Sequence, residues 1–129
     1  MNDGINPLGD LSAQRFLADY WQQRPLVVRQ AFPGFRSPLS AEELAGLSCE
    51  DGVDSRIVIE KGGAHPWQTL YGPMDEAVFR TLPETPWSLL VNDVEKHLPE
   101  LAWVPDCFRF IPEWCIDDLM ISYAPEGGS

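Results

Sequence analysis

Two adjacent carboxylates, Asp117 and Asp118, stand near the end of the chain in a run of mostly apolar residues. Neighbouring side chains of an extended strand point to opposite faces, so this pair cannot share a proton as a catalytic dyad would. Alternation instead places Asp118 on the same face as Met120. A carboxylate binds a planar guanidinium through paired hydrogen bonds, and a thioether packs against an aliphatic stem. The pattern therefore predicts a binding site for a cationic side chain, with a solvated strand end as the plain alternative.

The run that carries these residues, Cys115 to Ala124, predicts a strand. Its better core face holds Leu119, Ile121 and Tyr123, and the opposite face holds Ile116, Asp118, Met120 and Ser122. We expect Asp117 to be structural, accepting hydrogen bonds from nearby backbone donors. Gly127 and Gly128 follow, either as a flexible turn or as a position where two backbone segments approach closely.

Other chemistry finds little support in the sequence. The chain lacks a nucleophile elbow, a phosphate-binding glycine loop, an HExxH motif and a basic aromatic patch. His65 and His97 have no recognised ligand spacing to each other or to a cysteine, so no metal site is expected. The three cysteines are expected to be free or buried thiols. The five tryptophans are expected to be core or half-buried packing residues.

The formal net charge is −11 over 129 residues, and residues 66–129 carry most of it. An acidic surface repels nucleic acid and anionic membranes and attracts basic partners, although many cytosolic proteins are acidic only for solubility. No apolar run approaches the roughly 20 residues that a membrane span needs, and no secretory leader is visible. These features predict a cytoplasmic protein with no nucleic-acid or membrane partner.

The order of elements predicts one α+β domain after a loose lead-in at residues 1–10. We expect helices from Ser12 to the proline at 25, at 40–47 behind a Ser40–Glu43 capping box, at 74–82 with Asp75 as cap, at 93–97 and at 99–108. Before the last run, strands are expected at 26–28, 53–61, 67–71 and 88–91.

Several stretches in collinear order resemble the bacterial ribosomal oxygenases, which are JmjC-type members of the cupin superfamily that hydroxylate an arginine of a large-subunit ribosomal protein. The stretches are Tyr20-Trp21, Arg24 to Phe32, Pro38 to Leu47, Asp54 to Arg56, Trp87 to Val91, and Phe108 to Tyr123 with the following Gly-Gly turn. The resemblance implies an α+β fold in which amino-terminal helices and strands lead into the first strands of a double-stranded β-helix (the cupin/JmjC jelly roll), incomplete in this chain. Residues 11–129 would be the amino-terminal part of that oxygenase domain.

The resemblance also implies roles for particular residues. In that family the second aspartate and the methionine of the motif contact the target arginine, which corresponds to Asp118 and Met120 here. A His-X-Asp pair that binds iron follows the glycine turn in the family, and it is not present before Ser129. The parent protein is therefore expected to use Fe(II) and 2-oxoglutarate and to act on a basic ribosomal protein. The 129 residues alone are expected to bind neither cofactor and to be inactive.

A different class of protein fits the same composition. A stand-alone acidic interaction or immunity-type module that binds a basic protein partner would use the same charge and aromatic content. It would not account for the collinear stretches. If the chain is instead part of a β-helix, its unpaired strand edges are expected to favour a homodimer or other self-association.

Overall fold

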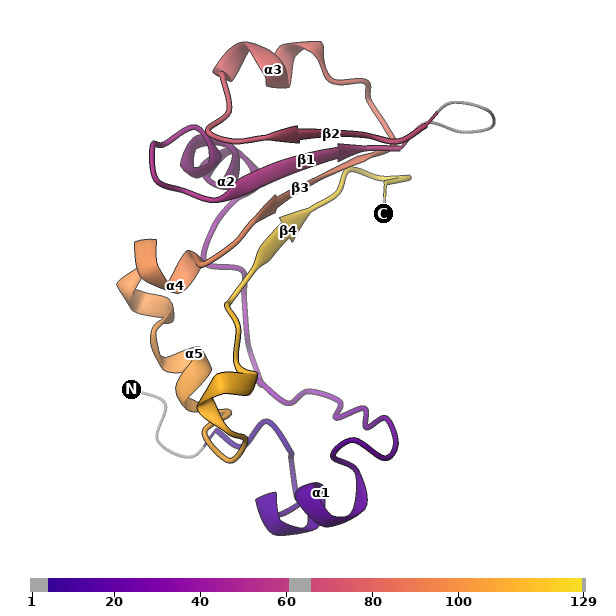
Figure 1. The fold of residues 1–129 in the computed structure, drawn as a ribbon, viewed down its shortest axis with the longest axis vertical. Coiled ribbons are helices and arrows are strands. Elements are labelled where there is room, and N and C mark those ends of the chain that lie inside the picture. Colours follow the sequence, from indigo (N-terminus) through magenta and orange to yellow (C-terminus); the bar gives the residue numbers. More distant parts are fainter. Residues whose placement is uncertain (1–4, 61–65, 129) are drawn as a thin grey trace. The chain divides into compact units, whose positions relative to one another are not determined.

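The computed structural model describes residues 5–60 and 66–128 (Figure 1). Contacts divide the chain into two compact units. The first unit comprises Met1–Arg36 and Ala102–Asp117, and the second comprises Ser37–Leu101 and Asp118–Ser129. The boundary between Asp117 and Asp118 falls inside the run that carries the candidate site.

The second unit is built on a four-stranded antiparallel sheet with the order β2-β1-β3-β4. Its strands are β1 (Ser55–Ile59), β2 (Gln68–Tyr71), β3 (Trp87–Val91) and β4 (Ile121–Tyr123). Figure 1 shows them side by side, with the last strand of the chain next to β3. This pairing brings the candidate site, late in the sequence, against elements some thirty residues earlier.

The two faces of the sheet differ in burial. On one face Ile57 pairs with Leu89, and both are buried together with Val91. The helix α2 (Ala41–Ser48) packs against β3 and β4 and contributes the buried Leu44. Burial of apolar side chains contributes about 25 cal/mol per Å², so this face is the stabilising core of the unit. The opposite face carries polar and half-exposed residues.

Local signals set the helices of the second unit. The Ser40–Glu43 capping box is present in full, with both reciprocal hydrogen bonds formed at the start of α2. Asp75 caps α3 (Glu76–Thr81) by accepting from the Ala77 N–H, as expected. Then follow α4 (Val94–His97) and a short 3₁₀ helix, η1 (Pro99–Leu101).

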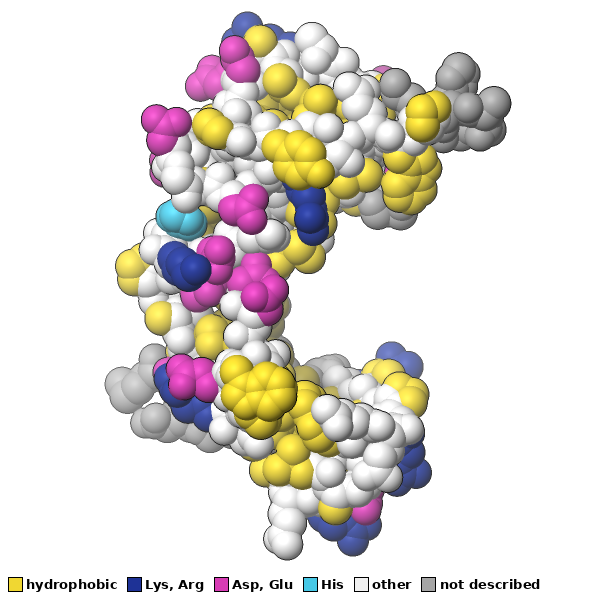
Figure 2. Space-filling view, in the orientation of Figure 1, with side chains coloured by type: hydrophobic (Ala, Val, Ile, Leu, Met, Phe, Trp, Pro, Cys, Tyr) yellow, Lys and Arg dark blue, Asp and Glu magenta, His cyan; other side chains and the backbone are white. Residues whose placement is uncertain are grey.

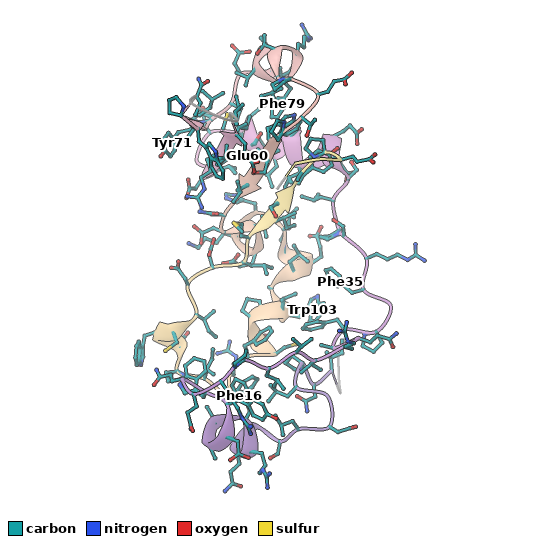
Figure 3. All side chains as sticks on the ribbon, turned by 90° about the vertical axis from the view of Figure 1, so that its right-hand side faces the viewer. Phe16, Phe35, Glu60, Tyr71, Phe79 and Trp103 are labelled. Atoms are coloured by element: carbon teal, nitrogen blue, oxygen red, sulfur yellow. The ribbon has the colours of Figure 1, made fainter. Side chains whose placement is uncertain are left out.

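Aromatic contacts hold the first unit together. It contains α1 (Ala13–Asp19), α5 (Trp103–Asp106) and the 3₁₀ helix η2 (Glu113–Cys115). Phe16 meets Phe110 edge-on with ring centroids 5.5 Å apart, and Phe32 meets Trp103 at 5.9 Å. Such offset contacts favour packing beyond the area that they bury. Phe16, Phe35 and Trp103 of this unit are labelled in Figure 3.

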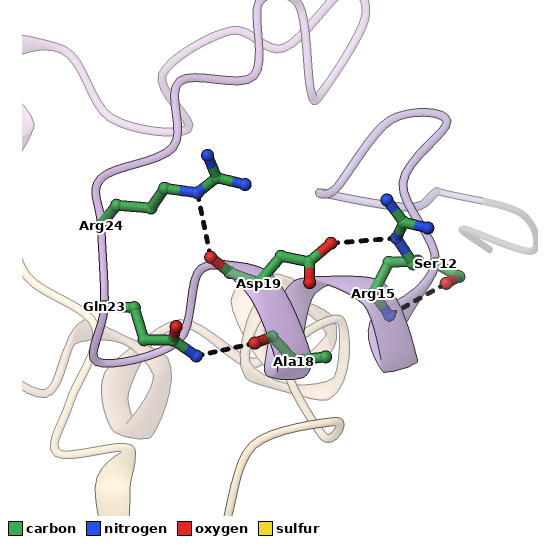
Figure 4. Close-up of polar contacts among 6 residues, drawn as sticks. All are labelled: Ser12, Arg15, Ala18, Asp19, Gln23 and Arg24. Carbon is green, nitrogen blue, oxygen red and sulfur yellow. Dashed lines mark hydrogen bonds and ion pairs between the residues drawn. The ribbon is translucent and has the colours of Figure 1, made fainter.

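Side chains close both ends of α1 (Figure 4). Ser12 accepts from the Arg15 N–H at the start, which confirms the predicted N-cap. At the other end, the Gln23 amide donates to the Ala18 carbonyl (2.6 Å) and Arg24 Nε donates to the Asp19 carbonyl (2.9 Å). These bonds satisfy carbonyls that the helix leaves unpaired, and the helix ends before the expected proline.

Besides the early end of α1, three predicted elements differ from the structure in extent or type. Residues 26–28 form no strand, because no described strand lies beside them to pair with. The expected helix at 99–108 is two short ones, since Pro105 has no N–H to donate and fits only in the first turn of α5. The expected strand at 115–124 is η2, an unpaired extended segment and the short β4.

The α+β fold class is confirmed, with a four-stranded antiparallel sheet. Within residues 5–60 and 66–128, no helix has the length and apolar character of a membrane span. Two of the five tryptophans contradict their expected packing role, because Trp67 is 65% exposed and Trp114 is 86% exposed.

Gly72 offers a test of packing at the end of β2. Its N–H donates to the Ser55 carbonyl (2.8 Å), and a Cβ at this position would collide with the buried Ser55 hydroxyl. That hydroxyl donates to the Ser48 carbonyl (3.2 Å) at the end of α2. We expect Gly72→Ala to lower the free energy of unfolding by about 1–3 kcal/mol, as overpacking does, measured by urea denaturation.

Gly46→Ala is the matched control, because nothing lies within 4 Å of the added carbon and the residue is in α2. Alanine favours a helix interior by up to about 1 kcal/mol over glycine, so this variant should be neutral or more stable. Equal denaturation midpoints for the two variants would contradict the packing described at Gly72.

Candidate functional site

Asp118 lies in the extended segment between η2 and β4, where its side chain is half-buried. Its Oδ2 accepts a hydrogen bond from the backbone N–H of Asp93, 3.1 Å away, at the start of α4. Among the described residues, no donor is bonded to Oδ1. The carboxylate is therefore fixed through one oxygen, and the other is available to a ligand.

The first turn of α4 holds the same segment by its backbone. The Val94 N–H donates to the Leu119 carbonyl (3.0 Å), and the Leu119 N–H donates to Glu95 Oε2 (3.2 Å). The first N–H groups of a helix have no partner inside the helix. Asp93 has a left-handed conformation (φ 55°), and its own side chain does not cap α4. Instead, the Asp118 side chain and the Leu119 carbonyl accept hydrogen bonds from the N–H groups at the start of α4.

Carboxylates outnumber cations around α4. Asp93, Glu95 and Asp118 lie there with Lys96, whose Nζ pairs with Asp93 Oδ1 at 2.8 Å. Figure 2 shows the acidic side chains gathered over α4 and the segment that leads into β4. The hydrogen bond to Asp93 and its charge raise the pKa of Lys96, and Glu95 and Asp118 add to that effect. The excess of negative charge suits a cationic ligand.

Met120, the second predicted site residue, directly precedes β4 and is 44% exposed. Alternation places it on the side of Ser122, which is opposite Leu90 of β3. The expected core-face residue Ile121 is opposite the buried Val91, on the helix-covered face. Asp117 is exposed at the end of the first unit.

The sequence reasoning missed a groove on the exposed face of the sheet. It has a volume of about 430 Å³ and is lined by Arg56, Val58, Glu60, Trp67, Thr69, Tyr71, Ser88 and Leu90. Tyr71, labelled in Figure 3, is 74% exposed. The alternation of β1 and β3 was the signal that could have found it, because every second residue of these strands points into the groove.

The Gly-Gly turn after β4 is a close-approach position. Gly127 has a φ of 84°, which favours glycine, and a Cβ on Gly128 would lie 2.6 Å from the Trp87 carbonyl oxygen. The Gly128 N–H donates to the Pro125 carbonyl (2.8 Å). The end of this segment is therefore pressed against the start of β3.

Over 5–60 and 66–128, no three His, Cys, Asp or Glu side chains gather as a metal site requires. His65 lies outside the described residues. Cys49, Cys107 and Cys115 are all free and half-buried. Burial and the neighbouring Asp106 raise the pKa of the Cys107 thiol, which disfavours its nucleophilic thiolate form.

The proteins that this chain resembles are ribosomal oxygenases. No family model matches the chain. By sequence it is 44% identical over 113 residues to the ribosomal protein uL16 3-hydroxylase of Escherichia coli, covering 88% of this chain. It is 38% identical over 119 residues to a probable ribosomal oxygenase of Haemophilus influenzae, covering 92% of this chain. The chain spans only 29% of the length of either relative.

Solved structures agree with the sequence matches. The ribosomal oxygenase YcfD of Escherichia coli has a TM-score of 0.80 and 43% identity, over 92% of this chain and 32% of that one. YcfD has also been solved with cobalt and 2-oxoglutarate. The resemblance expected from the sequence is thus confirmed for the amino-terminal portion of these proteins.

Lys96 provides a measurable report on the charges around α4. We expect its titration, followed by NMR at the carbon next to Nζ, to have a midpoint above the ordinary pKa of 10.5. Asp93→Asn should lower the midpoint most, because Asp93 is the main cause of the raised pKa, and Asp118→Asn should lower it less. A midpoint at or below that of the urea-unfolded chain would refute this arrangement.

The sign of the linked stability follows from the raised pKa. The folded state holds the Lys96 proton more tightly than the unfolded chain does. The contribution of this proton to the free energy of unfolding is therefore fully present below pH 10.5. It is lost as the pH rises through the higher midpoint of the folded chain.

Proposed function

We propose that this chain forms the amino-terminal part of a 2-oxoglutarate- and Fe(II)-dependent oxygenase that hydroxylates an arginine of a ribosomal protein. The observation that carries the proposal is the 44% identity to the uL16 3-hydroxylase, which extends over 88% of this chain. The TM-score of 0.80 to a ribosomal oxygenase supports the same conclusion from the fold. On this proposal, residues 11–129 belong to a JmjC/cupin-type domain, and β4 is among the first strands of its double-stranded β-helix.

The role proposed for Asp118 is to orient the substrate guanidinium. Oδ1 accepts one N–H in full, and Oδ2 accepts a second while it keeps the bond from Asp93. Two parallel bonds of this kind fix the plane of the guanidinium as well as its position. Met120, which is 44% exposed, would pack against the aliphatic part of the same arginine. Correct orientation near the oxidant accelerates the reaction because the side chain loses its rotational freedom on binding, before the transition state is reached.

Iron and 2-oxoglutarate, when bound in the complete oxygenase, supply the oxidant. The relative solved with cobalt and 2-oxoglutarate supports a metal and this co-substrate for the parent protein. On this proposal, the residues described here supply no iron ligand. The part of the chain described here would act on the substrate by binding and orientation alone.

The proposed substrate is a basic ribosomal protein in the cytoplasm. The uL16 substrate named for the Escherichia coli relative supports this class of partner. A net charge of −11 favours encounter with a basic protein over nucleic acid. The alternative of a stand-alone acidic module has no comparable support from sequence or fold.

A hybrid enzyme tests the proposal directly. In it, this chain replaces the matching amino-terminal segment of the Escherichia coli uL16 3-hydroxylase, to which it is 44% identical. We expect the hybrid to hydroxylate a uL16 peptide, measured as a mass increase of one oxygen by mass spectrometry. The 129-residue chain alone, assayed with Fe(II) and 2-oxoglutarate, should give no product. A folded hybrid that binds 2-oxoglutarate and leaves uL16 unmodified would argue against the proposed function.

Asp118→Asn in the hybrid tests the proposed site. The substitution removes the charge of the acceptor while keeping its shape, so kcat/KM for the peptide should fall by about ten- to a hundredfold. Asp117→Asn is the control, because it makes the same chemical change at the neighbouring, exposed residue. Equal effects of the two substitutions would show that Asp118 has no special role in substrate binding.

A further inference from the structure

Glu95 makes a hydrogen bond that its place in α4 does not require. Its side chain is half-buried, and Oε2 accepts from the Leu119 N–H at 3.2 Å, across 24 residues of sequence. A glutamate in a first helical turn is favoured by the helix dipole wherever its side chain points. The bond to Leu119 is therefore additional to the stability of α4, and it connects α4 to the residue that follows Asp118.

Three bonds from one helical turn converge on two residues. Leu119 has its N–H bonded to Glu95 and its carbonyl bonded to the Val94 N–H, while the Asp118 side chain is bonded to the Asp93 N–H. With both backbone groups of Leu119 fixed, the direction of the chain at Asp118 is set. Two of the three groups on the α4 side are backbone N–H donors, which only a substitution by proline would remove. Glu95 is the one contribution that depends on a side chain.

We propose that Glu95 is a positioning residue for Asp118, holding the Leu119 backbone so that the Asp118 carboxylate keeps Oδ2 on Asp93 and presents Oδ1 to a guanidinium. This inference rests on the proposed function, since it concerns the same site. Glu95 touches no reacting atom and acts only through the segment that it holds. Removal of its acceptor leaves the half-buried Leu119 N–H without a partner and loosens the segment.

A purely electrostatic role for Glu95 makes a different prediction. Its charge lies close to Asp93, Lys96 and Asp118, and it would attract a cation even without the bond to Leu119. Glu95→Gln separates the two roles, because the amide oxygen still accepts from Leu119 while the charge is gone. Glu95→Ala removes both.

The experiment uses the full 129-residue chain and Nα-acetylarginine amide as the probe, with binding followed by amide shifts in NMR spectra. Nα-acetylcitrulline amide, which has the same shape without the charge, is the control ligand. Glu95→Ala should weaken binding of the arginine probe by about fivefold, as the loss of one hydrogen bond predicts, and should move the Asp93 amide resonance. Glu95→Gln should restore both to within about twofold. Glu100→Ala, an exposed acid whose loss changes the net charge equally, should alter neither.

The outcomes separate the inference from the function on which it rests. Equal weakening by Glu95→Gln and Glu95→Ala would leave only a charge effect and overturn the positioning role. If Asp118→Asn does not weaken binding of the arginine probe, the proposed role of Asp118 in binding the substrate is overturned instead.

Discussion

Hydrogen bonds between the first turn of α4 and the segment before β4 fix how the last strand of the second unit joins its sheet. β3 ends at Val91, and the left-handed Asp93 turns the chain into α4. The segment arriving at β4 therefore meets N–H groups of a helix start instead of another strand. The bond from Val94 to Leu119 continues the pairing of β3 with β4 past the end of the sheet. The hydrogen bond from the Asp93 N–H belongs to the same set and fixes the Asp118 side chain. The fold and the candidate site therefore share one set of contacts.

Charge and geometry act together at this point. A carboxylate bonded through one oxygen to a backbone N–H loses rotational freedom before any ligand arrives, so less entropy is lost on binding. Lys96 pairs with Asp93 and leaves Asp118 and Glu95 without an ion pair of their own among the described residues. The surrounding negative charge is therefore only partly compensated. A guanidinium would complete the compensation and find an acceptor already oriented.

Sequence reasoning succeeded where the signal was local and failed where a neighbour decided the outcome. The Ser40–Glu43 capping box and the Asp75 cap lie within a few residues of the groups they bond, so the pattern contained the whole interaction. Residues 26–28 are a short β-branched run of the kind that favours a strand, but their partner would have to come from elsewhere in the fold. Asp118 was predicted as a site residue, whereas its bond to Asp93 links positions 25 residues apart and could not be read from spacing. The alternation of β1 and β3 indicated which residues share a face, but the pairing of these strands, which brings the lining of the groove together, could not be read from spacing.

The close approach at Gly128 has a consequence for how this chain can be joined to other polypeptide. Because the Gly128 backbone is pressed against the Trp87 carbonyl, the direction of exit from β4 is governed by β3. A domain fused immediately after this turn would have its orientation set by β3, an interior strand of the sheet, whereas a flexible spacer would leave that orientation free. The position of the junction in an engineered fusion therefore decides whether the fused domain has a defined or a free orientation relative to the sheet.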